Sequence, residues 1–226
     1  MTQARSPQGH SCILKVLVGS HAHGLAGPGS DKDFRSVFVI PTTEMFRVGF
    51  KYQGTKMMKE EADETSWEVG HFLLLALQGH PLVLESLMAP VVVMDDWGAE
   101  LRQLSPQLWS AREAYESFIN YCENQRKKML EKKDGRPAKY AAAYLRVLFN
   151  LCELLERGTF SIRIADTPIG GTVRRIKEGD YRVGEVIDLG EYWENEAARR
   201  LTICSRQGRP DLADAFLSKL RKAFLS

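Results

Sequence analysis

Hydrophobic positions in the first hundred residues follow strand-like and then helix-like periods. The run CILKVLV, residues 12–18, is apolar and rich in β-branched side chains and stops at a glycine, which predicts a buried strand and a turn. DFRSVFVIP, residues 33–41, alternates and then turns fully apolar before its proline, which predicts a second strand. Residues 54–67 mix acids with strand-compatible residues, and we expect a third strand that ends near 63–67.

Helical spacing begins at Glu68. Apolar residues at 69, 72, 73, 76 and 77 predict a helix over 68–78 that ends at the sequence GHP. A second short helix is expected in 82–90 and a further strand in VVVM, residues 91–94. The first part of the chain therefore reads as a small mixed sheet covered by helices.

Helical periodicity dominates beyond Trp97. We expect long helices at 106–132 and 137–157, one short strand in TFSIRI at 159–164, and closing helices at 191–205 and 210–224. The predicted fold class is α+β, with a mixed-sheet catalytic domain over 1–96 and a mainly helical domain over 97–226.

Composition limits the classes of function. The 226 residues are 44% hydrophobic and carry a net charge of +2, so a sizeable core is expected and bulk charge does not indicate nucleic-acid binding. Basic residues nevertheless gather at 126–128, 132–139 and 174–177, as a positive surface or as ordinary solvated helix faces.

Cellular location follows from cysteines and apolar runs. Four widely spaced cysteines form no metal-ligand pattern and indicate thiols in a reducing cytosol. The first ten residues lack an apolar segment, and the longest apolar stretch, 71–94, contains Gln78, His80, Pro81 and Glu85. We expect a cytoplasmic protein without a secretory signal or membrane span.

Asp31 and Asp33 are the first candidates for chemistry. Side chains at i and i+2 of a strand share a face, and two carboxylates held together favour a hard divalent cation between them. Two such ions can activate an attacking oxygen and stabilise a leaving one in nucleotidyl transfer. Alone, the pair is more typical of a surface turn.

Gly19 and Ser20 add a candidate phosphate site. Glycine lets the backbone approach a ligand, and Ser20 can offer a hydroxyl and an N–H at the start of a short helix through HAHGLA. In isolation, the same dipeptide is more typical of an ordinary capped helix. The combined pattern, strand, G-S-x-x-x-G, S-D-x-D and strand, is far more specific than its parts.

This combination resembles the nucleotidyltransferase superfamily that includes DNA polymerase beta. Within it, three blocks are similar to the predicted nucleotidyltransferases associated with RNA repair: GSHAHGLAGPGSDKDFRSVFV, EVGHFLLLALQGHPLVLESLMAP and KYAAAYLRVLFNLCELLERG. The resemblance covers roughly residues 13–157 and is strongest in the first block.

The resemblance implies a third carboxylate on a strand beside the D-x-D pair. We match Asp63 to that position, five residues before the glutamate that opens the apolar helix, with Glu64 and Glu68 as alternatives. His21 stands where relatives often carry arginine, and His80 precedes a proline where asparagine is usual.

A nucleotide-binding set follows from the same resemblance. It comprises Gly19, Ser20, His21, Gly24, Ser30, Lys139 and Arg146. Lys139 and Arg146 are seven residues apart on one helical stripe that could face a triphosphate, or form a solvated polar face. His23 is expected to be structural, and Tyr121 and Tyr140 either stack bases or pack in the core.

The implied reaction is nucleotidyl transfer from an NTP to a hydroxyl, most readily of RNA. Asp31, Asp33 and Asp63 would ligate two Mg²⁺ ions, with Mn²⁺ as the other candidate ion. Two rival interpretations are transfer to a protein or small molecule, and a nucleotide-binding module without catalysis. The sequence leaves the NTP and the oligomeric state undetermined.

Overall fold

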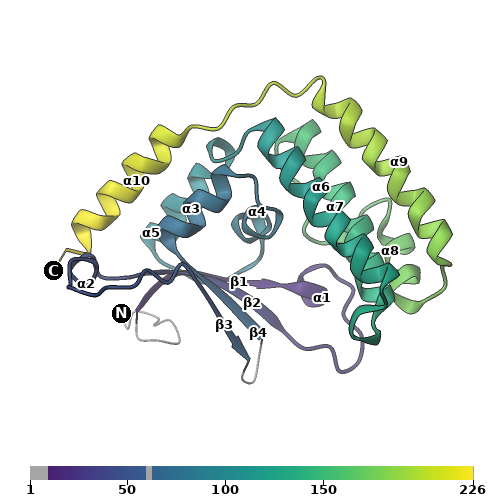
Figure 1. Cartoon of the computed structure of the whole chain (residues 1–226), viewed down its shortest axis with the longest axis horizontal. Helices are drawn as coiled ribbons and strands as arrows, with labels where there is room; N and C mark the ends of the chain where they lie inside the picture. Colours follow the sequence, from purple (N-terminus) through teal and green to yellow (C-terminus); the bar gives the residue numbers. More distant parts are fainter. Residues whose placement is uncertain (1–9, 60–62, 226) are drawn as a thin grey trace.

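In the computed structural model, which describes residues 10–59 and 63–225, five strands form one mixed sheet (Figure 1). Their order is β3-β4-β2-β1-β5, and β2 pairs with β4 in parallel while the other neighbours are antiparallel. The strands are β1 (Ser11–Val18), β2 (Asp33–Val39), β3 (Thr55–Lys59), β4 (Asp63–Glu68) and β5 (Val91–Met94). The predicted α+β class is confirmed.

Helices cover one side of the sheet and continue beyond it (Figure 1). Those of the first half are α1 (Gly19–Ala22), α2 (Thr42–Met45), α3 (Val69–Leu77) and α4 (Pro81–Met88). Those of the second half are α5 (Asp96–Leu104), α6 (Ala111–Leu130), α7 (Pro137–Arg157), α8 (Gly170–Glu178), α9 (Val183–Leu201) and α10 (Pro210–Ala223). Helix α7 is the centre of the second half, in contact with α6, α8 and α9.

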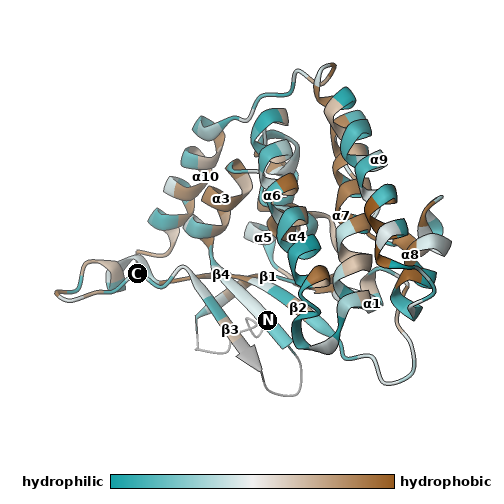
Figure 2. Cartoon of the chain, turned by 45° about the vertical axis from the view of Figure 1, so that its right-hand side comes forward, coloured by the Kyte–Doolittle hydropathy of each residue, from teal (hydrophilic) through white to brown (hydrophobic). Residues whose placement is uncertain are grey.

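Hydrophobic burial explains this arrangement. Residues 144–155 of α7 are buried throughout, as expected of a helix enclosed by neighbours. The outer helices α9 and α10 each present one hydrophobic and one hydrophilic side (Figure 2). No helix within residues 10–59 and 63–225 is both long and apolar enough to cross a bilayer.

Several predicted elements differ from those observed. The single strand expected in 54–67 is two strands, β3 and β4, and residues 60–62 between them lie outside the described part of the chain. The strand expected in 159–164 is wrong: Phe160 and Ile164 are buried in the helical half, and a single 3-10 turn follows at Ile164–Asp166. Phe160 packs edge-on against Phe118, so its apolar character serves helix packing rather than strand pairing.

Two longer helices escaped the sequence analysis and a third begins earlier than expected. Helix α5 starts where Asp95 accepts a bond from the Gly98 amide at 2.8 Å. Helix α8 begins with two glycines, which weaken its helical signal. Helix α9 starts eight residues before the predicted 191 and includes Gly190, where an added Cβ would overlap Tyr144 of α7. Tight helix contact, rather than local propensity, retains that glycine.

The two halves of the chain share one packed core. Helix α10 returns to the sheet half, where Phe216 and Phe224 pack against Trp97. Arg221 Nη2 of α10 pairs with the buried Glu68 at 2.6 Å. The division at residue 96 stays a prediction, and the last helix belongs to the packing of the first half.

Candidate active site

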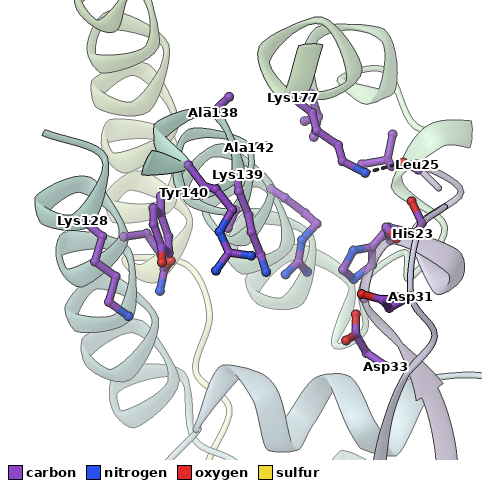
Figure 3. A pocket seen from close by; sticks show the side chains of 18 of the residues that line it. His23, Leu25, Asp31, Asp33, Lys128, Ala138, Lys139, Tyr140, Ala142 and Lys177 are labelled. Atoms are coloured by element: carbon purple, nitrogen blue, oxygen red, sulfur yellow. Dashed lines mark hydrogen bonds between the residues drawn. The ribbon is translucent and has the colours of Figure 1, made fainter. Parts of the chain in front are cut away.

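A cleft of about 750 Å³ opens between the sheet and the α6–α7 hairpin (Figure 3). Its sheet wall carries Ser20, Asp31, Asp33 and Asp63, and its helical wall carries Lys139. The volume lies within the range of about 300–1,000 Å³ that is usual for small-molecule and cofactor sites. Most residues of the predicted site are therefore gathered in one cavity.

The turn after β1 brings the backbone against a carboxylate. Gly19 has φ +66°, in the left-handed region that glycine enters readily. A Cβ on Gly19 would overlap Asp33 Oδ2, because Asp33 pairs with Val18 across the β1–β2 ladder. Helix α1 is a single turn of four residues, so phosphate binding there would rely on Ser20 and nearby amides.

Replacement of Gly19 by alanine should therefore displace Asp33. We expect Gly19→Ala to lower the nucleotidyl transfer predicted from the sequence at least about 10-fold, because misplacement by about 1 Å can cost about 10²-fold. Gly29→Ala is a matched control, because Gly29 also has positive φ, +75°, but an added Cβ meets nothing within 4 Å. Both variants carry the left-handed backbone cost of about 1–2 kcal/mol, so thermal melting should show similar losses. Equal activity of the two variants would contradict the steric argument.

Asp31 and Asp33 both line the cleft, but Asp31 lies in a loop and Asp33 is the first residue of a strand. Strand β2 begins at Asp33, so Asp31 lies in the preceding loop and the expectation that both acids occupy one strand is wrong. The glycine-rich and proline-containing loop delays strand pairing until Val18 meets Asp33. Both side chains still line the cleft and lie side by side in Figure 3.

Asp63 reaches the same cleft from the neighbouring parallel strand. Phe34 of β2 is in register with Glu64 of β4, so Asp33 and Asp63 begin the two strands at matching positions. Residues at matching positions of adjacent strands project to the same face. Asp31, Asp33 and Asp63 thus form an acidic wall.

The two alternatives for the third carboxylate have other partners. Glu64 receives Lys15 Nζ at 2.5 Å and the Ser36 hydroxyl at 2.7 Å. Glu68 is buried, pairs with Arg221 and caps α3 by accepting the Gly70 amide at 2.7 Å. Glu68 does not line the cleft, and Glu64 lines only a smaller hollow of about 210 Å³ on the β3 side of Asp33.

Electrostatics across the cleft connect the two walls. Partial burial raises the pKa of Asp33, and Asp63 and Asp31 raise it further, whereas Lys139 and Arg35 act in the opposite direction. Lys139 and Asp33 lie on opposite walls of the cleft in Figure 3, and the positive charge of Lys139 acts to lower the pKa of Asp33. This acidic wall has the charge that a divalent cation requires.

The carboxylates of the acidic wall fit Mg²⁺ in the way of sites where the substrate supplies part of the coordination shell. Within the described residues, no three acidic, histidine or cysteine side chains already form a closed metal site. Mg²⁺ is usually held by one or two carboxylates together with substrate phosphates and waters, rather than by a complete protein cage. The oxygen donors of Asp31, Asp33 and Asp63 suit that arrangement.

A buried ion cluster lies at the deep end of the cleft. Glu85 of α4 is 2% exposed and bonds to Arg35 Nη1 at 2.5 Å, Arg146 Nη1 at 2.9 Å and His23 Nε2 at 2.7 Å. We call these four residues the Glu85 cluster. Burial acts to raise the pKa of Glu85, but Arg146, Arg35 and His23 outweigh it and hold this pKa well below its ordinary value. Burial, together with Arg146, lowers the pKa of His23, while its hydrogen bond to Glu85 acts in the opposite direction.

The Glu85 cluster predicts an acid-sensitive stability. A carboxyl whose folded pKa is depressed stabilises the protein above its unfolded pKa, about 4.5, and that contribution is lost as pH falls toward the folded pKa. We expect the free energy of unfolding of the wild type to fall more steeply below about pH 4.5 than that of Glu85→Gln. Urea titrations at intervals between pH 6 and 3 measure this. Parallel pH profiles for the two proteins would contradict the assignment.

The helical wall differs from the predicted polar stripe. Lys139 is exposed and faces the cleft, whereas Arg146 is buried and paired with Glu85 while still lining the cavity. Arg146 is therefore not part of a solvated polar face. Its partner Glu85 lies 61 residues away in the chain, so helical periodicity alone could not reveal the pairing.

Three of the predicted nucleotide-binding residues stabilise the loop between β1 and β2. His21 Nε2 bonds to the Ser30 carbonyl oxygen at 2.9 Å, and Ser30 Oγ accepts the Gly27 amide. Gly24 packs against Ala165 and Arg163. Ser30 lines the cleft, but His21 and Gly24 do not.

Other cleft residues were missed or given another role by the sequence analysis. They are Arg35, Leu82, Gln125, Lys128, Arg136 and Lys177. Arg35 carried a local signal, because it lies two residues after Asp33 on the same strand face. Lys128, Arg136 and Lys177 belong to the basic clusters at 126–128, 132–139 and 174–177, which left open whether they form a positive surface or solvated helix faces. Lys177 of α8 donates to the Leu25 carbonyl at 2.6 Å and ties the loop to the helical half (Figure 3).

Comparison with known proteins identifies a matching family and a partial relative. The model of the RNA repair pathway DNA polymerase beta family matches residues 1–167, from the sheet through α7. An uncharacterized 38.9 kDa protein in the nrdC-mobD intergenic region of enterobacteria phage T4 is 30% identical over 94 residues. That alignment covers 37% of this chain and 28% of the phage protein.

Proposed function

This chain belongs to the RNA repair pathway DNA polymerase beta family, and from that premise we propose that it transfers a nucleoside monophosphate from an NTP to a hydroxyl of RNA. The resemblance to the RNA-repair branch of nucleotidyltransferases is thereby confirmed, and membership suggests a nucleotidyltransferase activity. One observation carries the proposal of substrate and reaction. The acidic wall of Asp31, Asp33 and Asp63 faces Ser20 and Lys139 within one cleft.

Each side chain has a defined part in the proposed reaction. Ser20 and adjacent backbone amides bind the β- and γ-phosphates, and Lys139 neutralises their charge from the opposite wall. Asp31, Asp33 and Asp63 would hold two Mg²⁺ ions, or Mn²⁺, and when bound such ions activate the acceptor oxygen and stabilise the charge on the leaving group.

Bond changes are those of a direct displacement. The acceptor oxygen forms a bond to the α-phosphorus, the bond from that phosphorus to the β-phosphate oxygen breaks, and pyrophosphate leaves. The proton of the acceptor hydroxyl passes to the Asp63 carboxylate and then to water. Catalysis of this kind depends on positioning and electrostatics, and no covalent nucleophile on the protein takes part.

The open end of the cleft supports RNA as the acceptor. Lys128 and Arg136 line the cleft and would provide positive charge where an RNA phosphate backbone enters. Tyr140 lies beneath Lys128, with the ammonium 5.7 Å from the ring centroid. Cationic and aromatic groups side by side are typical of surfaces that bind single-stranded nucleic acid.

Mass spectrometry can test this function directly. The protein is incubated with each NTP, Mg²⁺ and either total RNA or total protein, with Asp33→Asn as the negative control. RNA that gains the mass of one nucleotide only with the wild type is the expected result. Modified protein without modified RNA would assign a different acceptor, and tight NTP binding without any product would indicate a module that has lost catalysis.

A further inference from the structure

A stripe of α6 forms the back of the cleft. Tyr121, Gln125 and Lys128 line it at positions i, i+4 and i+7, which share one helix face. Lys128 lies at the open end, beside Tyr140 of α7. Tyr121 and Gln125 lie deeper, where Ala142 and Arg146 of α7 line the same cavity.

Gln125 is buried without a protein partner. It is 6% exposed, lines the cleft, and has no hydrogen-bond partner for its carboxamide among the described residues. The Tyr121 hydroxyl, one turn away, likewise has no hydrogen bond to any described residue, and burial raises its pKa. Both groups therefore keep unused hydrogen-bonding capacity on successive turns of one helix, open to the cleft that they line. A polar ligand in the cleft could bind to both.

Arg146 adds a fixed donor beside these two groups. Its Nη1 is held by Glu85 at 2.9 Å, which orients the guanidinium and leaves its other N–H groups available at the cavity wall. The Glu85 cluster restrains Arg146 from three further elements, through Arg35 on β2, His23 after α1 and Glu85 on α4. An oriented guanidinium discriminates between hydrogen-bonding partners better than a mobile one.

The deep end is also shaped for a flat group. Ala142 and Ala143 of α7, whose side chains are small, line the cleft together with the aromatic side chain of Tyr121 on α6. At the open end, by contrast, the Tyr140 hydroxyl is already bonded to Asp134 at 2.8 Å and its ring lies beneath Lys128. The deep end thus combines room, an aromatic face and unpaired polar groups.

We propose that Tyr121, Gln125 and Arg146 form the nucleobase subsite and that they select guanine or uracil over adenine. This inference rests on the proposed function, because it assumes a triphosphate bound between Ser20 and Lys139. The guanidinium has only donors, so it pairs with O6 of guanine or O4 of uracil and is opposed by the N6 amino donor that adenine presents at the matching position. The Gln125 carboxamide oxygen accepts the ring N–H beside that carbonyl, which guanine and uracil both have. A site built around such donors rejects a base that leaves them unpaired.

Calorimetric titration separates the base contacts from the phosphate contacts. GTP, UTP, CTP, ATP and ribose 5′-triphosphate, which has no base, are titrated into the full chain with Mg²⁺ and without acceptor. We expect GTP or UTP to bind about 10-fold or more tightly than ATP and CTP, as one good bidentate contact provides. Gln125→Leu should weaken that NTP about 10-fold and leave ribose 5′-triphosphate unchanged.

Two further variants keep the test decisive. Asn124→Leu is the matched control. Asn124 directly precedes Gln125 on α6 and carries the same kind of carboxamide, but it is exposed and does not line the cleft. Tyr121→Phe removes only a hydroxyl, so it should preserve the fold and weaken binding of the same NTP. It therefore tests the inference even if Gln125→Leu does not fold. Equal or tighter binding of ATP would overturn the inference, as would variants that weaken ribose 5′-triphosphate as much as the NTP. A wild type that binds no triphosphate, including the baseless one, would overturn the proposed function itself.

Discussion

Asp33→Asn should abolish nucleotidyl transfer while leaving the fold intact. Asp33 is the central carboxylate of the acidic wall: it contacts the Gly19 turn, matches Asp63 across the parallel strands, and responds to the charge of Lys139. Loss of a single electrostatic stabiliser typically lowers kcat by about 10²–10³. We expect at least this loss, because Asp33 would serve both the metal ions and the geometry of the phosphate turn.

Stability measurements give the control for this prediction. Asparagine keeps the shape of Asp33 and removes a charge that Asp31 and Asp63 repel, so thermal stability should be unchanged or slightly raised. Asp188→Asn, an exposed acid on α9, should leave transfer at the wild-type rate. Activity of Asp33→Asn within a few-fold of wild type, measured by incorporation of labelled nucleotide into RNA, would remove the basis of the proposed mechanism.

Glu85→Leu should be the most destabilising single substitution in the cleft. It leaves Arg35 and Arg146 facing each other without the carboxylate that separates them, and both are mostly buried. Removing one partner of a buried ion pair costs about 3–5 kcal/mol, because the remaining charge is uncompensated. The midpoint of urea unfolding should fall accordingly, with an unchanged slope.

An exposed ion pair provides the comparison. Glu156 pairs with Arg200 at 3.1 Å and is half exposed, so Glu156→Leu should cost less than about 1 kcal/mol. Combining Glu85→Leu with Arg146→Met should recover part of the lost stability, since the double variant removes one of the uncompensated charges. Equal losses for Glu85→Leu and Glu156→Leu would show that the Glu85 cluster does not hold the two halves together.

Some elements of the fold could be predicted from the sequence and others could not. The first two strands, the turn between them and the helices at 68–78 and 137–157 were found because each follows from local spacing. The strand expected at 159–164 was wrong because an apolar run shows only that residues are buried, not which neighbours bury them. Helix α8 was missed because its first residues are glycines and its stability comes from packing against α7.

Sequence by itself determined the parts whose physics is local: a glycine that can take positive φ, a serine beside it, and two aspartates one residue apart at the mouth of a strand. Tertiary structure decided which further groups share the cleft with them. Asp63 reaches it through the parallel register of β2 and β4. The cleft residues Arg35, Arg146 and His23 are held by Glu85, which is 50, 61 and 62 residues away from them in the chain. Burial and pairing between such distant residues depend on how whole elements pack, and one-dimensional spacing does not encode that packing.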